Sequence, residues 1–136
     1  MLLKGMDYFP LSTDFFEEDK IALIEAEFGE KGLVILLKLF CKIYKNGFYL
    51  EWDEDICLLF ARKTMNGLLP EAVKQVIGKA LERGLFDKRM YERFGILTSV
   101  EIQRQFFLVA NRRRGLDYGK RFFVDRFVGL QKHTCL

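Results

Sequence analysis

Apolar and polar positions follow helical spacing over most of the first half of the chain. In the stretch STDFFEEDKIALIEAEFG, apolar residues recur every three or four positions, which predicts a helix that buries one face and ends at Phe28. Asp14 or Asp19 is the expected N-cap. A second helix is predicted from Glu30 to Lys45. Its polar positions form one narrow stripe of lysines, so we expect this helix at the centre of the core.

The middle of the chain predicts one short strand and two helices. The aromatic-rich segment FYLEW, residues 48–52, is typical of a strand. Asp53 is the predicted N-cap of a helix that continues to about Lys63. The apolar positions of that helix predict a buried face of Ile56, Leu59 and Phe60. After the turn TMNGLL, Pro70 stands at the first position of a further helix, which ends at Gly84.

The helix that begins at Pro70 is predicted to be amphipathic. Its inward positions are Val73, Val76, Ile77, Ala80 and Leu81. Its outward positions are Lys74, Gln75, Gly78 and Lys79. This helix therefore presents two cations and an amide to solvent, which are side chains that can contact phosphates and base edges.

The segment RGLFDKRMYERFGILTS places two apolar pairs, Leu85-Phe86 and Ile96-Leu97, on either side of a basic loop. This pattern predicts a β-hairpin over residues 85–98 that completes a small sheet with FYLEW, although KRMYERF is long enough to hold a turn of helix. Thr98 followed by Glu101 is a capping-box pattern, which predicts a last helix from Ser99 to about Arg114. The pattern weakens over residues 115–136, which form either another amphipathic helix or a tail.

The predicted order from residue 30 to residue 98 is helix, strand, helix, turn, helix, strand, loop, strand. This is the order of a winged helix-turn-helix, in which the basic loop is the wing. We therefore expect a mainly α (α+β) fold with a small antiparallel sheet and extra N- and C-terminal helices. The expected domain is residues 1–114, with its core in 14–114, and residues 115–136 are a C-terminal basic arm or helix.

Charge is distributed unevenly along the chain. Residues 1–60 hold six lysines and twelve acids, a net charge of −6, whereas residues 61–136 hold sixteen Lys or Arg and seven acids, a net charge of +9. Such asymmetry suggests either a polyanionic partner or self-association between unlike faces, or it reflects only a solvated surface. The three cysteines are an odd number, and Cys41 and Cys57 fall in apolar helical patterns, so we expect both to be buried and reduced in a cytoplasmic protein.

The sequence disfavours an enzyme, a cofactor, a metal site and a membrane span. The only histidine, His133, lies in the tail, so no histidine triad or multi-histidine metal site can form. The acids from Glu51 to Asp55 are better explained by helix capping than by metal binding. The longest apolar run is interrupted by Lys38 and Lys42 and is too short to span a membrane.

Two groups of residues are candidates for binding partners. The first is cationic and polar, and we expect it to contact DNA: Lys74, Gln75, Lys79, Arg83, Lys88, Arg89, Arg93, Arg112, Arg113 and Arg114. The second is aromatic and precedes the first helix, where it either packs on its own domain or docks into a second copy of the chain: Tyr8, Phe9, Phe15 and Phe16. The alternative to DNA contact is a module that serves only oligomerisation or binding to other proteins.

Three ordered blocks give the chain a family resemblance. They are GMDYFPLSTDFFEEDKIALIEAEFGEKG, LFCKIYKNGFYLEWDEDICLLFARK, and ERGLFDKRMYERFGILTS ahead of a helix that ends in NRRR. Over roughly residues 5–114 the chain resembles the N-terminal winged-helix domain of DnaD-like replication-initiation and replisome-organiser proteins of phages and mobile elements, catalogued as a domain of unknown function. The resemblance implies a DNA-replication context, self-association and other replication proteins as partners, and it brings no catalytic residues.

Overall fold

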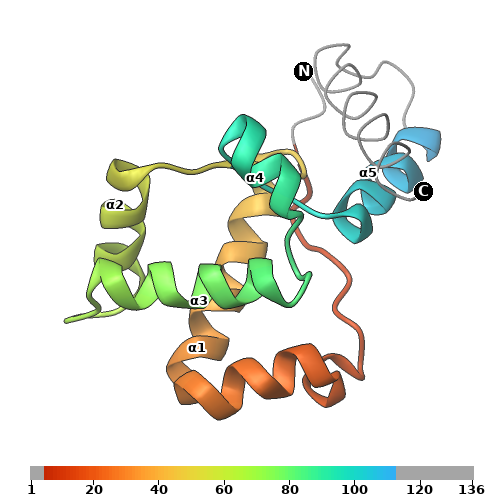
Figure 1. The fold of residues 1–136 in the computed structure, drawn as a ribbon. Helices are drawn as coiled ribbons and strands as arrows, with labels where there is room; N and C mark the ends of the chain where they lie inside the picture. Colours follow the sequence, from red (N-terminus) through yellow and green to blue (C-terminus); the bar gives the residue numbers. More distant parts are fainter. Residues whose placement is uncertain (1–4, 113–136) are drawn as a thin grey trace.

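The computed structural model describes residues 5–112, with side chains through residue 110, and the elements are mostly helical (Figure 1). In chain order they are the 3-10 helix η1 (Phe15–Glu17), α1 (Asp19–Asn46), β1 (Leu50–Glu51), α2 (Glu54–Thr64), α3 (Pro70–Glu82), α4 (Lys88–Phe94), β2 (Ile96–Leu97) and α5 (Val100–Arg112). The mainly helical fold with a small antiparallel sheet is confirmed. The predicted domain limit at residue 114 lies outside the described residues.

Helix α1 contains both of the first two predicted helices, separated by a kink at Gly29. Gly29 has φ 73° and ψ −161°, a conformation that glycine adopts and other residues avoid. Figure 1 shows α1 sharply bent as a result. The N-cap prediction is wrong: Glu18 occupies that position without a side-chain hydrogen bond, and Asp19 lies in the first turn. Asp14 stands at the N-terminal end of the short η1, also without a side-chain capping bond, so the chain reaches α1 through one extra turn.

Helix α2 begins as predicted. The Ile56 backbone N–H donates to Asp53 Oδ1 at 2.8 Å, so Asp53 is the N-cap. The predicted buried face is only partly correct, because Phe60 is buried whereas Leu59 is 54% exposed. Helix α2 packs on α3 through the side that carries Cys57 and Ala61, and Leu59 points away from that side.

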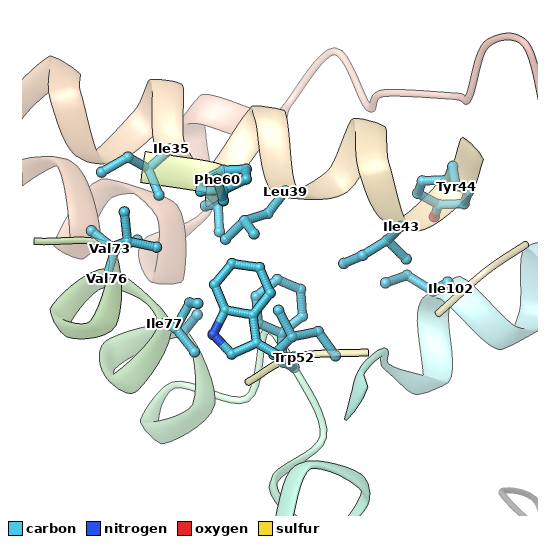
Figure 2. Close-up of a cluster of buried hydrophobic side chains, with 14 of the residues drawn as sticks. Ile35, Leu39, Ile43, Tyr44, Trp52, Phe60, Val73, Val76, Ile77 and Ile102 are labelled. Carbon is cyan, nitrogen blue, oxygen red and sulfur yellow. The ribbon is translucent and has the colours of Figure 1, made fainter. Parts of the chain in front are cut away.

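Helix α3 also matches its prediction, with Pro70 in its first turn. Four predicted inward residues are buried and Leu81 is half-buried, while Lys74, Gln75 and Gly78 are exposed. Figure 2 shows Trp52 lying between Leu39 of α1 and Ile77 of α3. The ring of Trp52 meets that of Phe60 edge-on at 5.6 Å, so the aromatic side chains link α1, α2 and α3.

The predicted wing hairpin is wrong. Residues 85–86 are not a strand, and the basic segment between the apolar pairs is helix α4. Asp87 caps α4 by accepting from the Met90 N–H at 2.9 Å, and Gly95, with φ 65°, ends it in the left-handed conformation. The alternative that KRMYERF holds a turn of helix is confirmed. This helix occupies the whole of the predicted loop. The winged helix-turn-helix as a whole stays a prediction.

The sheet consists of β1 and β2 alone, in antiparallel pairing with Leu50 opposite Leu97 and Glu51 opposite Ile96. The predicted strand 48–52 is shortened because Phe48 has φ 78° and belongs to the turn that follows Gly47. Within the described residues, no helix is long and apolar enough to cross a membrane.

Helix α5 begins near the predicted residue but with a different cap. The Ile102 N–H donates to Ser99 Oγ at 3.2 Å, whereas the Thr98 hydroxyl donates to the Phe48 carbonyl at 2.8 Å. The predicted capping box between Thr98 and Glu101 is therefore wrong, because the Thr98 hydroxyl is already engaged in the core. Glu101 instead pairs with Arg104 on the same helix at 2.8 Å.

The cysteine prediction is half correct. Cys57 is buried, and its burial raises the pKa of its thiol. Cys41 is exposed, because it lies on the same side of α1 as Lys38 and Lys45, three positions after one and four before the other. Cys135 lies outside the described residues.

Candidate nucleic-acid interface

The two predicted DNA-contacting lysines of α3 are both paired with acids. Lys74 Nζ lies 2.8 Å from Glu54 Oε1 of α2, and this hydrogen bond raises the pKa of Lys74. Lys79 Nζ lies 3.7 Å from Glu27 of α1 and 3.5 Å from Glu82. Glu54 and Glu27 come from α2 and α1, so the pattern of α3 alone does not show these two pairings, whereas Glu82 lies on α3 itself, three residues after Lys79.

These ion pairs are solvated. The side chains of Lys74 and Glu54 are 40% and 81% exposed. Exposed pairs of this kind contribute little to stability because water screens them, so a phosphate can replace the carboxylate at little cost. Gln75 is also exposed on this helix, as predicted. The outward face of α3 can thus contact an anion, but its positive charge is already partly neutralised.

A second group of predicted cations lies where α3 ends and along α4. Arg83 is the C-cap of α3, and Lys88, Arg89 and Arg93 are exposed on α4. We call these four residues the α4 cation cluster. Among the ion pairs within residues 5–110, none involves any of the four. Their charge is therefore available to an external anion.

The position of Lys88 and Arg89 is unusual for helix-terminal cations. They occupy the first turn of α4, which contains no acid, and so face the positive end of the helix dipole. Other terminal cations, such as Lys79 and Arg93, lie in last turns, where the dipole favours them. The helix dipole therefore accounts for the positions of Lys79 and Arg93, but it disfavours those of Lys88 and Arg89.

The predicted oligomerisation residues divide into two pairs. Phe9 stacks on Tyr44 with ring centroids 4.7 Å apart, and Phe15 is buried in the core. Both side chains therefore pack on their own domain, which is one of the two alternatives predicted for these positions. Tyr8 and Phe16 are 81% and 48% exposed and stay candidates for contact with another chain.

Comparison with known proteins places the chain in a family. The sequence model described as Lin1244/Lin1753-like, N-terminal, matches residues 8–102. The chain belongs to the Lin1244/Lin1753-like N-terminal family. It is also similar to the uncharacterized phage-related protein Lin1244/Lin1753 of Listeria innocua serovar 6a, with 38% identity over 113 residues, 83% of this chain. The chain spans 36% of the length of that relative. No solved structure matches it.

The match to the Lin1244/Lin1753-like family includes some predicted contacts and excludes others. The cations of α3 and the whole α4 cation cluster fall within residues 8–102. Arg112 lies beyond that span, and its side chain is not described, while Arg113 and Arg114 lie outside the described residues altogether. The relationship to a DnaD-like family is a separate expectation that this match does not address.

A cavity of about 710 Å³ lies between the N-terminal segment, α1 and α5. Its lining includes apolar residues such as Phe9, Phe40 and Val100 together with charged residues such as Glu18 and Arg104. The sequence pattern does not mark this cavity, because its walls come from segments far apart in the chain. Within the described residues, no three His, Cys, Asp or Glu side chains gather where they could hold a metal ion.

Proposed function

We propose that this chain is a non-enzymatic, DNA-binding module of a phage-related replication protein, and that the α4 cation cluster supplies its main phosphate contacts. The phage context is supported by the similarity to the phage-related protein of Listeria innocua. The replication context is supported by the resemblance to DnaD-like proteins over residues 5–114. DNA binding is supported by the charges of the described surface.

One observation carries the proposal: Lys88 and Arg89 stand, exposed and without an ion pair, in the first turn of α4. Cations at this position destabilise a helix by a few tenths of a kcal/mol each, so the fold gains nothing from them there. A phosphate backbone supplies counter-charge to these two cations beyond that of the N-cap Asp87, and it releases its own counterions. Arg83 and Arg93 extend the same cluster.

Helix α3 has a secondary role in this proposal. Phosphates compete with Glu54 for Lys74 and with Glu27 for Lys79, and Gln75 carries the donor and acceptor that can read a base edge. Lysine and arginine contacts to phosphate carry no sequence information. The module is therefore expected to bind DNA with little intrinsic sequence preference.

The alternative is a protein-interaction module that does not contact DNA. It is favoured by the pairing of both α3 lysines with acids of the same chain. The two functions differ in their response to salt, because release of counterions makes phosphate binding fall steeply as salt rises.

The test is a salt titration of DNA binding by the whole 136-residue chain. Fluorescence anisotropy with labelled duplex and single-stranded DNA would be compared for wild type and for the triple variant Lys88→Gln, Arg89→Gln, Arg93→Gln. If all three cations contact phosphate, the slope of log binding constant against log salt falls by about 3 for duplex DNA, at about 0.9 per contact.

The matched control removes three positive charges from α1: Lys31→Gln, Lys42→Gln and Lys45→Gln. Lys38 is left in place because it donates to the Thr64 carbonyl at 2.9 Å. The control is expected to keep nearly the wild-type slope. Equal losses in both variants would show that only net charge matters. Absence of salt-dependent binding by wild type would support the interaction module instead.

A further inference from the structure

The exposed side of α2 has a pattern that its own domain does not use. Two adjacent leucines, Leu58 and Leu59, are 52% and 54% exposed in the middle of the helix. Residues 54–55 and 62–63, one turn before and one turn after, are also exposed. We call this set the α2 outer face: Glu54, Asp55, Leu58, Leu59, Arg62 and Lys63. Figure 1 shows α2 at the edge of the molecule, away from α5.

The charges of the α2 outer face are arranged about its centre. Both acids precede the leucines and both bases follow them, each pair one helical turn away. The midpoint lies between Leu58 and Leu59. If two such helices pack antiparallel about that midpoint, each acidic pair lies opposite a basic pair, and leucine lies opposite leucine. A parallel arrangement would instead place like charges together.

Helix capping explains each charged pair separately but not the whole face. Acids in the first turn and bases in the last turn stabilise any helix. The dipole gives no reason for two half-exposed leucines between them, and an exposed apolar pair is the part that an interface would bury. The exposed Phe107 and Leu108 of α5 do not have such flanking pairs, since Arg104 pairs with Glu101 of the same helix.

We propose that the α2 outer face is a homodimer interface, in which α2 packs antiparallel on α2 of a second copy of this chain about a two-fold axis between Leu58 and Leu59. A two-fold axis makes each copy meet the same face of the other, as this self-complementary pattern requires. The inference does not depend on DNA binding. It places the self-association surface on α2 and not on the N-terminal aromatic residues, of which Phe9 and Phe15 are covered by their own domain.

The small area of this contact limits the expected affinity of the homodimer. One helix of three turns buries less than the roughly 1,200–2,000 Å² of a standard interface. Association is therefore expected in the micromolar range. The existing bond from Lys74 to Glu54 is retained in the dimer, since the carboxylate has a second oxygen for a base of the other copy.

The first test is sedimentation equilibrium of the whole chain without DNA, over concentrations from about 1 to about 200 µM. Wild type should approach twice the chain mass of 16.0 kDa as concentration rises. The variant Leu58→Gln, Leu59→Gln should dimerise at least ten times more weakly. The control Leu23→Gln, Leu108→Gln removes two other exposed leucines and should behave as wild type. Circular dichroism would establish that each variant is folded.

The second test examines the antiparallel geometry by reversing the charges of Asp55 and Arg62. These two positions are chosen because neither takes part in the bond between Glu54 and Lys74. Asp55→Arg alone and Arg62→Asp alone should each weaken the homodimer, because like charges then face each other twice. An equimolar mixture of the two variants should dimerise as wild type does, and so should a single chain that carries both changes.

Three outcomes would overturn the proposal. A wild-type chain that stays monomeric at every concentration has no such interface. A leucine variant that dimerises like wild type, or a control that does not, places the interface elsewhere. Failure of the mixed charge variants to recover dimerisation rules out the antiparallel pairing of α2.

Discussion

At the scale of single residues, one carbonyl oxygen organises the buried polar groups. The Phe48 carbonyl accepts from the Thr98 hydroxyl at 2.8 Å and from Gln103 Nε2 at 3.0 Å. Gln103 Nε2 also donates to Thr98 Oγ1 at 2.9 Å. These bonds hold α5 against the turn in which Phe48 has φ 78°. Gln103 Oε1 is buried with no hydrogen-bond partner among the described residues, so the network already includes one unsatisfied atom.

Replacing Thr98 with Val should therefore destabilise the protein more than the small change in side-chain shape suggests. The change keeps the shape of the side chain but removes a donor to Phe48 and the acceptor for one Gln103 bond. Phe48 and Gln103 keep the bond to each other, so the loss is that of two buried hydrogen bonds, about 0.5–1.5 kcal/mol each. Chemical unfolding in urea would measure the loss, and Thr13→Val, at an exposed position, is the control. Equal stabilities of the two variants would contradict the role of the network.

Tyr44 should make stability depend on alkaline pH. Burial, with a smaller contribution from the Glu101 carboxylate, raises the pKa of Tyr44 to about 12 from its ordinary value of 10.0. Because the folded pKa lies above the unfolded pKa, the neutral form contributes stability below pH 10, and this contribution is lost as the pH rises to about 12. The expected loss is of the order of 2 kcal/mol.

The measurement is the free energy of unfolding at several pH values from 9 to 12, for wild type and for Tyr44→Phe. The variant removes the ionising hydroxyl and keeps the ring that stacks on Phe9. Wild type should lose more stability across this range than the variant does. Parallel curves for the two proteins would show that Tyr44 does not titrate in the folded state as expected.

At the scale of elements, two glycines show opposite requirements. Gly29 has φ 73° at the kink of α1, and an added Cβ would meet no atom within 4 Å. Gly78 lies exposed in the middle of α3, also with open space around it. Gly29→Ala should cost about 1–3 kcal/mol from backbone strain alone. Gly78→Ala should add about 0.5–1 kcal/mol, because alanine loses less chain entropy in a helix.

Thermal unfolding of the two alanine variants tests this difference directly. Neither substitution introduces a clash, so the sign of each change reports the backbone alone. A stabilising Gly29→Ala would mean that α1 is straight at that position. A destabilising Gly78→Ala would mean that this part of α3 is not an ordinary helix.

The sequence predicts those elements whose ends carry chemical signals. Asp53 as an N-cap, Pro70 at the start of α3 and Gly29 at the kink all act within one turn of the chain, so local pattern finds them. Helix α4 carried the same kind of signals, with Asp87 before it and Gly95 after it. The apolar pairs on either side nevertheless predict two strands, so the sequence pattern favours a hairpin loop at these residues.

The candidate site is harder to predict because its electrostatics depend on contacts between distant segments. Lys79 follows Glu27 by 52 positions, and only packing of α3 on α1 brings them to 3.7 Å. The exposure of Leu59 likewise depends on which side of α2 meets α3. Sequence spacing predicted which cations face solvent but could not predict which of them already have a partner.

At the scale of the whole molecule, the basic part of the chain extends further along the sequence than the family match does. The family match ends at residue 102, whereas the basic character continues through Arg112, Arg113 and Arg114. The three arginines are predicted DNA contacts in their own right, and electrostatic contacts to phosphate add up with little demand on geometry. The two groups are then expected to contribute independently to DNA binding.

The variant Arg112→Gln, Arg113→Gln, Arg114→Gln tests that independence. If the three arginines contact phosphate, the slope of log binding constant against log salt should fall by about 1–3 for duplex DNA. Combining this variant with the triple change in α4 should lower the slope by the sum of the two separate effects, because each phosphate contact releases its own counterions. The α1 triple variant again controls for net charge. An unchanged slope would remove the arginines from the DNA contact, and a combined effect smaller than the sum would mean that the two groups bind the same phosphates.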